Sequence, residues 1–256
     1  MRKPIAEIIP IKGMIVSGDS GAGGPVPFFP FGGGSMTFSD EIIRCLGKLE
    51  KDRRVKAVIL EIDSPGGTPY ASKEIADAVK KLTISTVAQI RERGTSGAYW
   101  IASACDAIIA DPLSTMGGIG TRADRLDLSE LAKKLGIKVD TFARGEYKDM
   151  GSPYSQTSEK EKAFIQQHVD SFNQYFVEEI KKNRKIQDQE LLEDITSGKS
   201  FLGKEALDLG LIDQLGASRE ALQKAQDLAQ VKLLAVHRKV RSDKSGLLMR
   251  LLKKFF

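Results

Sequence analysis

Hydrophobic and polar positions follow two patterns that alternate along the chain. Runs rich in Val, Ile and Ala predict buried strands, whereas apolar residues three and four positions apart predict amphipathic helices. Strands and helices that alternate without an internal repeat predict a single α/β domain. The expected strands are 5–16 (interrupted near Pro10), 55–62, 86–93, 106–112, 137–143 and 231–240, and the expected helices are 38–51, 70–82, 96–104, 127–135, 158–184 and 218–229, with shorter helical pieces in 188–216.

Two segments break this alternation. Residues 17–36 are too rich in Gly and Pro for regular structure and are predicted to form a loop. Its three phenylalanines, Phe28, Phe29 and Phe31, either line a substrate-binding site or dock on the surface. The basic, apolar tail 241–256 is interpreted as an interfacial helix, an oligomer contact or a frayed end. The domain itself is therefore expected to span residues 1–240.

Composition narrows the possible functions. The 256 residues are 41% hydrophobic and 29% charged, as in ordinary soluble globular proteins. The net charge of +5 is modest and basic residues are interspersed with acidic ones, so a nucleic-acid partner is not expected. Cys45 and Cys105 lack metal-type spacing, and His168 and His237 are the only histidines. Neither a metal site nor another cofactor is therefore expected.

The lengths of the apolar runs bear on whether the chain crosses a membrane. No run approaches the roughly 18 apolar residues that a membrane-spanning helix requires. The first residues also lack the long apolar region of a signal peptide. The sequence therefore predicts no membrane span in this chain and leaves its location open, including contact with a membrane surface.

Residues 94–100, G-T-S-G-A-Y-W, contain a candidate nucleophile. Ser96 follows a predicted strand and begins a predicted short helix, where free backbone N–H groups and the positive end of the helix dipole lie close by. A serine nucleophile needs such surroundings, because its attack on a carbonyl leaves an oxyanion that backbone donors must hold. A plain helix cap is the alternative interpretation of the same residue.

A glycine pair supplies candidate oxyanion donors. D-S-P-G-G at 63–67 ends a predicted strand and precedes a predicted helix. Gly66 and Gly67 allow backbone N–H groups to face a ligand without an obstructing side chain. An ordinary turn between a strand and a helix is the alternative.

Three motifs taken together resemble the signature of the signal peptide peptidase A family, the half-length bacterial and archaeal serine proteases with a Ser-Lys dyad. They are D-S-P-G-G (63–67), T-S-G-A-Y-W (95–100) and Y-K-D-M-G-S-P (147–153). The resemblance covers about residues 5–240. Further matches are D-A-I-I-A-D-P (106–112) and the run G-K-S-F-L-G-K-E-A-L-D-L-G-L-I-D-Q-L-G (198–216).

The resemblance implies both a fold and a site. The fold is expected to be similar to Clp protease and crotonase, an α/β fold built from repeated β-β-α units. Ser96 is implied as the nucleophile, Lys148 as the general base, and Gly67 and Gly97 as the oxyanion-hole donors. The implied activity is cleavage of remnant signal peptides and other short apolar or unfolded peptides through an acyl-enzyme. The family also implies membrane association and a ring-shaped homo-oligomer, an octamer for half-length members, with serine and lysine from neighbouring subunits.

The chemistry of the residues agrees with a lysine base. His168 lies on the apolar face of the predicted helix 158–184 and His237 lies in a late basic strand, so neither is a good base for Ser96. A lysine accepts a proton only when it is neutral, and its ordinary pKa of about 10.4 must fall by about three units for that near pH 7. Burial against a neighbouring subunit would lower the pKa of Lys148 in this way.

The sequence departs from the family pattern at several positions. Arg91, Glu92 and Arg93 stand before the nucleophile where small or apolar residues are usual, and could form pairs between subunits. Gly118 stands where the family often has a serine that hydrogen-bonds the catalytic lysine, so Ser114, Thr115 or water is expected to orient Lys148 instead. Two substitutions with little expected effect are Ala98 for Gly and Trp100 for Tyr.

Two other functions remain possible from the residues alone. A crotonase-type acyl-CoA enzyme would use the same oxyanion hole with an acidic residue, for which Glu92 is the only nearby candidate. A non-catalytic oligomeric scaffold at a membrane would use the basic tail.

Overall fold

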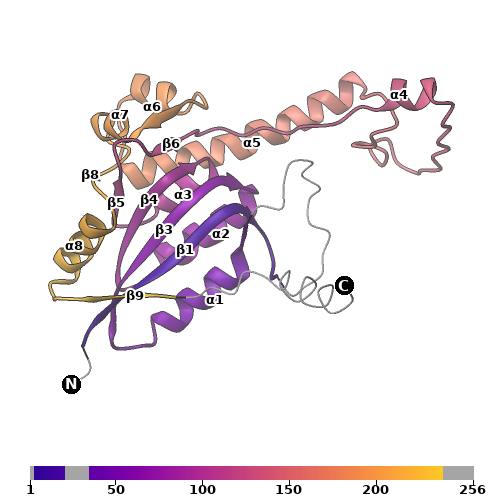
Figure 1. Ribbon diagram of the computed structural model, residues 1–256. Coiled ribbons are helices and arrows are strands. Elements are labelled where there is room, and N and C mark those ends of the chain that lie inside the picture. The colour runs from indigo at the N-terminus through magenta and orange to yellow at the C-terminus, as the bar shows by residue number, and fades with distance from the viewer. Residues whose placement is uncertain (1–2, 21–34, 239–256) are drawn as a thin grey trace, which may run out of the picture. The chain divides into compact units, whose positions relative to one another are not determined.

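The computed structural model describes residues 3–20 and 35–238, which fall into two compact units (Figure 1). The first unit comprises the residues up to 119 together with those from 177 onward, and the second comprises residues 120–176. Ser96 belongs to the first unit and Lys148 to the second. Phe28, Phe29, Phe31 and the tail 241–256 lie outside the described residues.

The first unit is organised around a mostly parallel sheet. Its central order is β2-β1-β3-β4-β5-β8, with β9 also on β1 and β6 on β4, and only the pairing of β6 with β7 is antiparallel. Parallel strands rich in Val and Ile, covered by helices, are typical of α/β folds. The strands are β1 (Ile5–Val16), β2 (Met36–Phe38), β3 (Val55–Gly67), β4 (Ser85–Thr95), β5 (Ala107–Ala110), β6 (Thr115–Gly117), β7 (Ser200–Leu202), β8 (Gln214–Leu215) and β9 (Leu234–His237).

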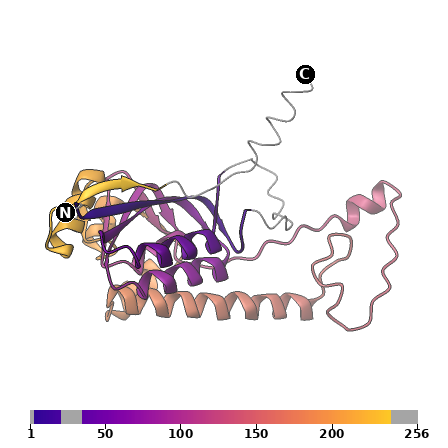
Figure 2. The same ribbon diagram turned by 90° about the horizontal axis from the view of Figure 1, so that it is seen from below.

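Helices in this unit follow the strands and cover the sheet. Figure 2 shows α1 and α2 on one face of the sheet, and α3 also packs against β3 and β4. The helices of the first unit are α1 (Ser39–Leu49), α2 (Pro69–Lys80), α3 (Gly97–Ser103), α6 (Gln189–Ile195), α7 (Gly203–Asp208) and α8 (Ser218–Ala229), together with the last turns of α5 (Glu159–Arg184).

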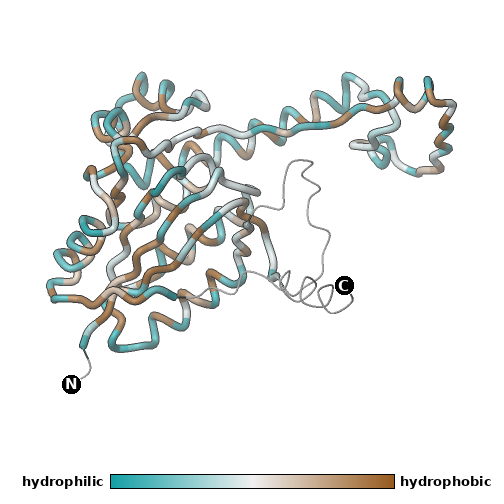
Figure 3. Tube along the Cα trace, in the orientation of Figure 1, coloured by the Kyte–Doolittle hydropathy of each residue, from teal (hydrophilic) through white to brown (hydrophobic). Residues whose placement is uncertain are grey.

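Both faces of the sheet are partly buried, which explains the near-continuous apolar runs of its strands. Alternate residues of β1 and β3, with Val87 of β4 and Ile109 of β5, form a core with α8. Figure 3 shows the hydrophobic stretches along these strands. The core on the α8 side contains Ala6, Ile8, Ala57, Ile59, Val87, Ile109, Ala221, Ala225 and Leu233. Beyond the end of this core, the same face carries the charged residues Lys12, Glu61 and Arg91.

The second unit is small and has few buried side chains. It contains α4 (Ser129–Lys134) and most of α5, joined by a long irregular segment. The expected capping box is confirmed at the start of α5, where the Ser158 amide donates to Glu161 at 2.7 Å. The expected helix end at Gly136 is also confirmed, since its φ is +70° and its amide donates to Lys133.

Several predicted elements differ from the structure. The expected break at Pro10 is wrong, because β1 is continuous and Pro10 lies where only β3 pairs with it. The expected strand 137–143 is also wrong, since none of the described residues pairs with it and Ile137 and Val139 are about half exposed. On α5, Phe176 is buried, but Phe172 is 51% exposed, so the expected apolar face is not a buried one along its whole length.

Candidate active site

Ser96 lies at the junction of β4 and α3 in a backbone conformation that is unusual for serine. Its φ is +54° and its ψ is −128°, in the region that favours glycine. A non-glycine residue held there costs of order 1–3 kcal/mol, and such strain is typical of functional positions. The Ser96 amide donates to the Gly117 carbonyl at 2.7 Å, and its carbonyl accepts from the Trp100 amide at 3.0 Å. Both bonds fix the backbone and leave the side chain free to react.

Gly66 and Gly67 lie directly against Ser96 and Gly97. A Cβ added to Gly66 would stand 2.8 Å from both the Ser96 Cβ and the Gly97 nitrogen. The Gly67 nitrogen is 3.4 Å from the point that a Cβ on Gly97 would occupy. Gly97 is the first residue of α3, where an amide has no acceptor within the helix. The structure thus brings together the serine and both expected oxyanion donors.

The close approach depends on β3 continuing further than its sequence suggests. The P-G-G segment was expected to be a turn, but β3 runs to Gly67, which pairs with Ile15 of β1. Gly67 has no room for a side chain, because a Cβ there would be 1.8 Å from the Ile15 carbonyl oxygen. The Ser64 hydroxyl holds this end of β3 in place. It accepts from the Gly66 amide at 3.0 Å and donates to the Gly13 carbonyl at 2.6 Å.

Ser72 is a supporting residue that the sequence analysis missed. It is fully buried on α2, and its hydroxyl donates to the Thr68 carbonyl at 3.0 Å. A Cβ on Gly97 would stand 2.1 Å from the Ser72 Oγ, so α2 sets how closely α3 approaches β3. A serine in the second turn of an ordinary helix gives no sequence signal for this role.

Lys148 lies in the second unit, in an exposed loop between α4 and α5. Its amide donates to the Gly145 carbonyl at 3.1 Å, which closes a turn around the lysine. Beside it, Tyr147 stacks on Phe164 of α5 with ring centroids 5.1 Å apart. The loop thus has local order, while its lysine is open to solvent within the chain.

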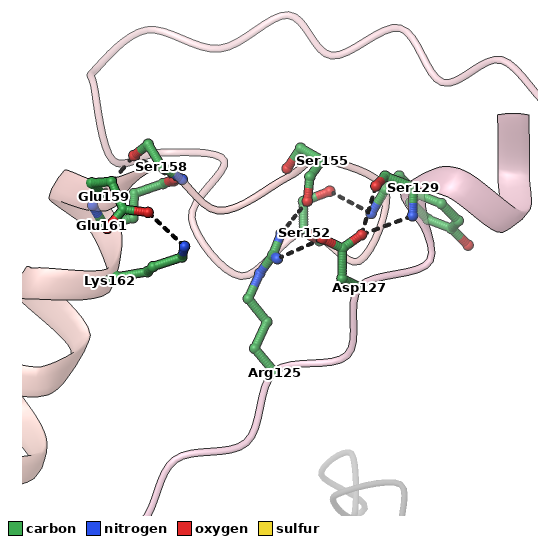
Figure 4. A network of polar contacts seen from close by, with 10 residues as sticks. Arg125, Asp127, Ser129, Ser152, Ser155, Ser158, Glu159, Glu161 and Lys162 are labelled. Atoms are coloured by element: carbon green, nitrogen blue, oxygen red, sulfur yellow. Dashed lines mark hydrogen bonds and ion pairs between the residues drawn. The ribbon is translucent and has the colours of Figure 1, made fainter.

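Arg125 holds the chain that follows Lys148, as Figure 4 shows. Its guanidinium donates to the carbonyls of Ser152 and Ser155, and the Leu128 amide donates to the Pro153 carbonyl at 2.7 Å. Only 17% of the Arg125 side chain is exposed. These contacts tie the 152–155 turn to the segment that leads into α4.

Of the two histidines, His168 lies in the second unit, and only His237 belongs to the same unit as Ser96. His168 is exposed on α5 and lies edge-on to Phe164, with ring centroids 4.4 Å apart. His237 ends β9 and pairs with Ile8, seven residues before the Ile15 level at which Gly67 lies. Seven residues of a strand correspond to about 23 Å. His237 is therefore at the opposite end of the sheet from Ser96.

The comparison with family models matches residues 77–232 to peptidase family S49. This match includes Ser96, Lys148 and more than half of the chain. The chain belongs to peptidase family S49.

The relatives of this S49 chain include three that are named as proteases or peptidases. It is 37% identical over 74% of its length to a candidate protease of Methanocaldococcus jannaschii, spanning 61% of that protein. It is 38% identical over 69% of its length to a candidate signal peptide peptidase of Enterococcus faecium, spanning 52% of that protein. It is 29% identical over 78% of its length to the chloroplastic serine protease SPPA of Arabidopsis thaliana, spanning 30% of it. The chain thus spans about half to two thirds of the first two relatives.

The fold is that of a solved S49-type protease. The membrane-bound stomatin-specific protease 1510-N superposes with a TM-score of 0.59 at 16% identity, covering 93% of this chain and 99% of the other. A second structure of that protease, with a substrate peptide, gives the same TM-score at 18% identity over 99% and 100% of the two chains. The expected Clp protease and crotonase-like α/β fold is confirmed. Among the described residues, no helix combines the length and apolar content of a membrane span.

Ser114 and Thr115, the two residues expected to orient Lys148, differ in their surroundings in this S49 chain. Ser114 is 1% exposed, and its hydroxyl bonds to the Arg91 carbonyl and accepts from the Asp111 amide at 3.1 Å. Its hydrogen-bonding capacity therefore serves the backbone near the end of β5. Thr115 begins β6, at the level of Arg93 on β4 and Leu202 on β7. Thr115 remains an expectation as a lysine partner.

One of the charged residues that precede Ser96 belongs to an ion cluster. Glu61 is 6% exposed and pairs with Lys12 at 3.0 Å and Arg91 at 3.2 Å. Burial alone would raise the pKa of Glu61, but hydrogen bonds and charge from Lys12 and Arg91 outweigh it and lower that pKa. Arg91 thus has a partner within its own chain, whereas Glu92 and Arg93 are exposed at the end of β4.

Proposed function

We propose that this chain is a serine endopeptidase in which Ser96 is the nucleophile and Lys148 the general base. The observation that carries the proposal is the strained Ser96, held against the Gly66–Gly67 backbone at the start of α3. In the proposed site, the Ser96 hydroxyl and the Gly67 and Gly97 amides face one reacting carbonyl. Membership of peptidase family S49 supports a peptide bond as the bond that is cleaved.

The proposed reaction has two steps. Neutral Lys148 accepts the Ser96 proton as the Ser96 Oγ adds to the peptide carbonyl carbon, and the Gly67 and Gly97 amides donate to the resulting oxyanion. The C–N bond then breaks, the lysine ammonium returns the proton to the leaving amine, and an acyl-enzyme remains. Lys148 next takes a proton from water, the water oxygen replaces Ser96 on the acyl group, and the proton returns to Ser96.

The exposed loop around Lys148 requires a further element. A solvent-exposed amine stays protonated near pH 7, so the base must be buried before it can act. We infer that a second copy of the chain provides this burial and that Ser96 and Lys148 of one site come from neighbouring subunits. A ring-shaped homo-oligomer, with eight copies as the expected number, meets this requirement.

The proposed substrates are remnant signal peptides and other short apolar or unfolded peptides. One relative is named for signal peptides, and the solved structures of 1510-N include a lysine-to-alanine mutant with a substrate peptide bound. Association with a membrane surface is part of this proposal, because such peptides remain in or near membranes.

Two inactive variants test the dyad. Ser96→Ala and Lys148→Ala are each expected to abolish cleavage of an apolar fluorogenic peptide, while both retain the oligomeric state of the wild type. The matched control is Lys138→Ala, which removes another exposed lysine of the second unit and should leave cleavage unchanged. Full activity in either dyad variant would show that the assignment is wrong.

Mixing the two variants tests which subunit supplies the lysine. If each site takes Ser96 and Lys148 from neighbouring subunits, equal amounts dissociated and reassembled together recover about a quarter of wild-type activity, because one interface in four pairs two intact residues. If both residues come from one chain, the mixture remains inactive. Wild-type protein taken through the same procedure controls for losses during reassembly.

A further inference from the structure

Ser200 of β7 lies at the same level of the sheet as the end of β4, the strand that leads to Ser96. Thr95 of β4 pairs with Gly117 of β6, and Gly117 pairs in turn with Ser200 of β7. Ser96 directly follows Thr95 and donates its amide to Gly117. The pairing of β4, β6 and β7 therefore places Ser200 level with Thr95, the residue before the candidate nucleophile.

Gly118 itself places no side chain beside Ser200 and Ser96, and the Thr95 Cβ lies 3.3 Å from the point where a Gly118 Cβ would stand. The point where a Gly118 Cβ would stand is 3.4 Å from the Ser200 Oγ and 3.5 Å from the Ser96 nitrogen. The Gly118 φ of +57° lies in the left-handed region, and its amide donates to the Lys199 carbonyl at 2.7 Å. This bond holds the start of β7 against the glycine and fixes the position of Ser200.

The Ser200 hydroxyl is not used by the surrounding fold. Within the part of the chain that the structure describes, it has no hydrogen-bond partner, and the residue is exposed. The hydroxyl of Ser197 in the same segment donates to the Asp194 carbonyl at 2.7 Å, and Ser114 bonds to the backbone as described above. Ser200 thus has a free hydroxyl beside the candidate active site.

We propose that the Ser200 hydroxyl positions the general base next to Ser96, an inference that rests on the proposed function. A neutral lysine amine has one lone pair to accept the Ser96 proton and two N–H groups that need acceptors. The Ser200 oxygen accepts one of these N–H groups and so directs the lone pair toward the Ser96 hydroxyl. Once the amine is protonated, the same oxygen accepts from the ammonium group. Ser200 is therefore a positioning residue and takes no proton itself.

Two substitutions of equal shape test this role. Ser200→Thr keeps the hydroxyl, whereas Ser200→Val replaces it with a methyl group, and both residues suit a strand. Ser200→Val is expected to lower kcat about tenfold or more, with KM within about twofold of wild type. Its rate of Ser96 labelling by a fluorophosphonate probe should fall by a similar factor. Ser200→Thr should stay within about threefold of wild type on both measures.

The outcomes separate this inference from the proposed function. Ser197→Ala is the control for removing a hydroxyl from the same segment, and the thermal midpoint of each variant reports on folding. Equal kcat values for Ser200→Thr and Ser200→Val would overturn the role of Ser200, as would a loss seen only in KM. If Ser96→Ala or Lys148→Ala remains active, the dyad itself fails. If both are inactive while Ser200→Val is normal, only the role of Ser200 fails.

Discussion

Ser96 and Lys148 are held by their own units in opposite ways. Ser96 is fixed by a strand pairing, a helix start and a glycine backbone packed against it, and the helix that follows is wholly buried. Lys148 lies in an exposed loop with no strand pairing among the described residues, and hydrogen bonds from Arg125 and the Leu128 amide hold the chain that follows. The sheet thus fixes the position of the proposed nucleophile, whereas the proposed base lies in the open and is buried, in the proposed mechanism, by a neighbouring subunit.

Among changes to the residues that support the site, the largest loss of peptide cleavage should come from disturbing the contact between Gly97 and Ser72. Gly97→Ala would place a Cβ 2.1 Å from the Ser72 Oγ, so α3 and its first amide must move. Loss of a well-placed oxyanion donor costs about 10²–10³ in kcat, and a loss of about 100-fold in peptide cleavage is expected. Steady-state kinetics and a thermal unfolding curve measure the two consequences.

A second substitution shows whether this contact is the cause. Ser72→Gly removes the opposing side chain, at a cost of about 1 kcal/mol for a glycine in a helix. The double variant Gly97→Ala with Ser72→Gly should recover part of the activity that Gly97→Ala loses. No recovery would mean that Gly97 matters for another reason.

A smaller loss of peptide cleavage is expected when the loop that contains Lys148 is held less firmly. Arg125→Ala removes the donor to the Ser152 and Ser155 carbonyls, so residues 144–157 should exchange amide hydrogens faster. Cleavage should fall about tenfold, since a misplaced base lowers the rate without removing the chemistry. Amides of α3 should keep their protection, and hydrogen-exchange mass spectrometry measures both regions.

The matched control for Arg125 is Arg122→Ala. Arg122 is 87% exposed and pairs only with the exposed Asp124, so neither activity nor exchange should change. Faster amide exchange in α3 of the Arg125→Ala variant would contradict the view that Ser96 and the loop around Lys148 are held independently.

The smallest effect concerns the ion cluster near the end of β4. Glu61→Gln should lower the free energy of unfolding by about 1 kcal/mol at pH 7, because Lys12 and Arg91 are half exposed and remain solvated. The folded state lowers the pKa of Glu61, so the stabilisation is complete above its unfolded pKa and is lost as the pH falls through the folded value.

Urea unfolding at several pH values checks this sign. The difference between wild type and Glu61→Gln should be present at neutral pH and shrink in acid. A difference that grows in acid would contradict the lowered pKa. Cleavage by Glu61→Gln at neutral pH should stay close to wild type, since Ser96 is fixed by other contacts.

The pattern of apolar and polar residues predicted the long strands and helices. The spaced motifs predicted that Ser96 and Gly97 belong to the candidate site. The strain at Ser96 could not be foreseen, because it arises from pairing with Gly117 and contact with Gly66. The P-G-G segment has the composition of a turn, yet pairing with β1 keeps it in the strand to Gly67. Residues 137–143 have the composition of a strand but no partner in the described chain.

Supporting side chains were the hardest to predict. Ser72 and Ser200 lie in segments with ordinary helix and turn composition, and only tertiary contacts bring them to Ser96. Single-residue chemistry could identify which groups react. It could not identify which neighbours determine their positions.

The left-handed backbone of Ser96 also bears on how such a chain changes over generations. A glycine at this position would relieve the strain and keep the backbone hydrogen bonds to Gly117 and Trp100, so Ser96→Gly should fold at least as stably as the protein with serine. Mutation alone would therefore favour, at this residue, a better-folded protein without a nucleophile. Continued presence of serine there requires selection for activity, and lineages released from that selection would readily become inactive scaffolds with the same fold.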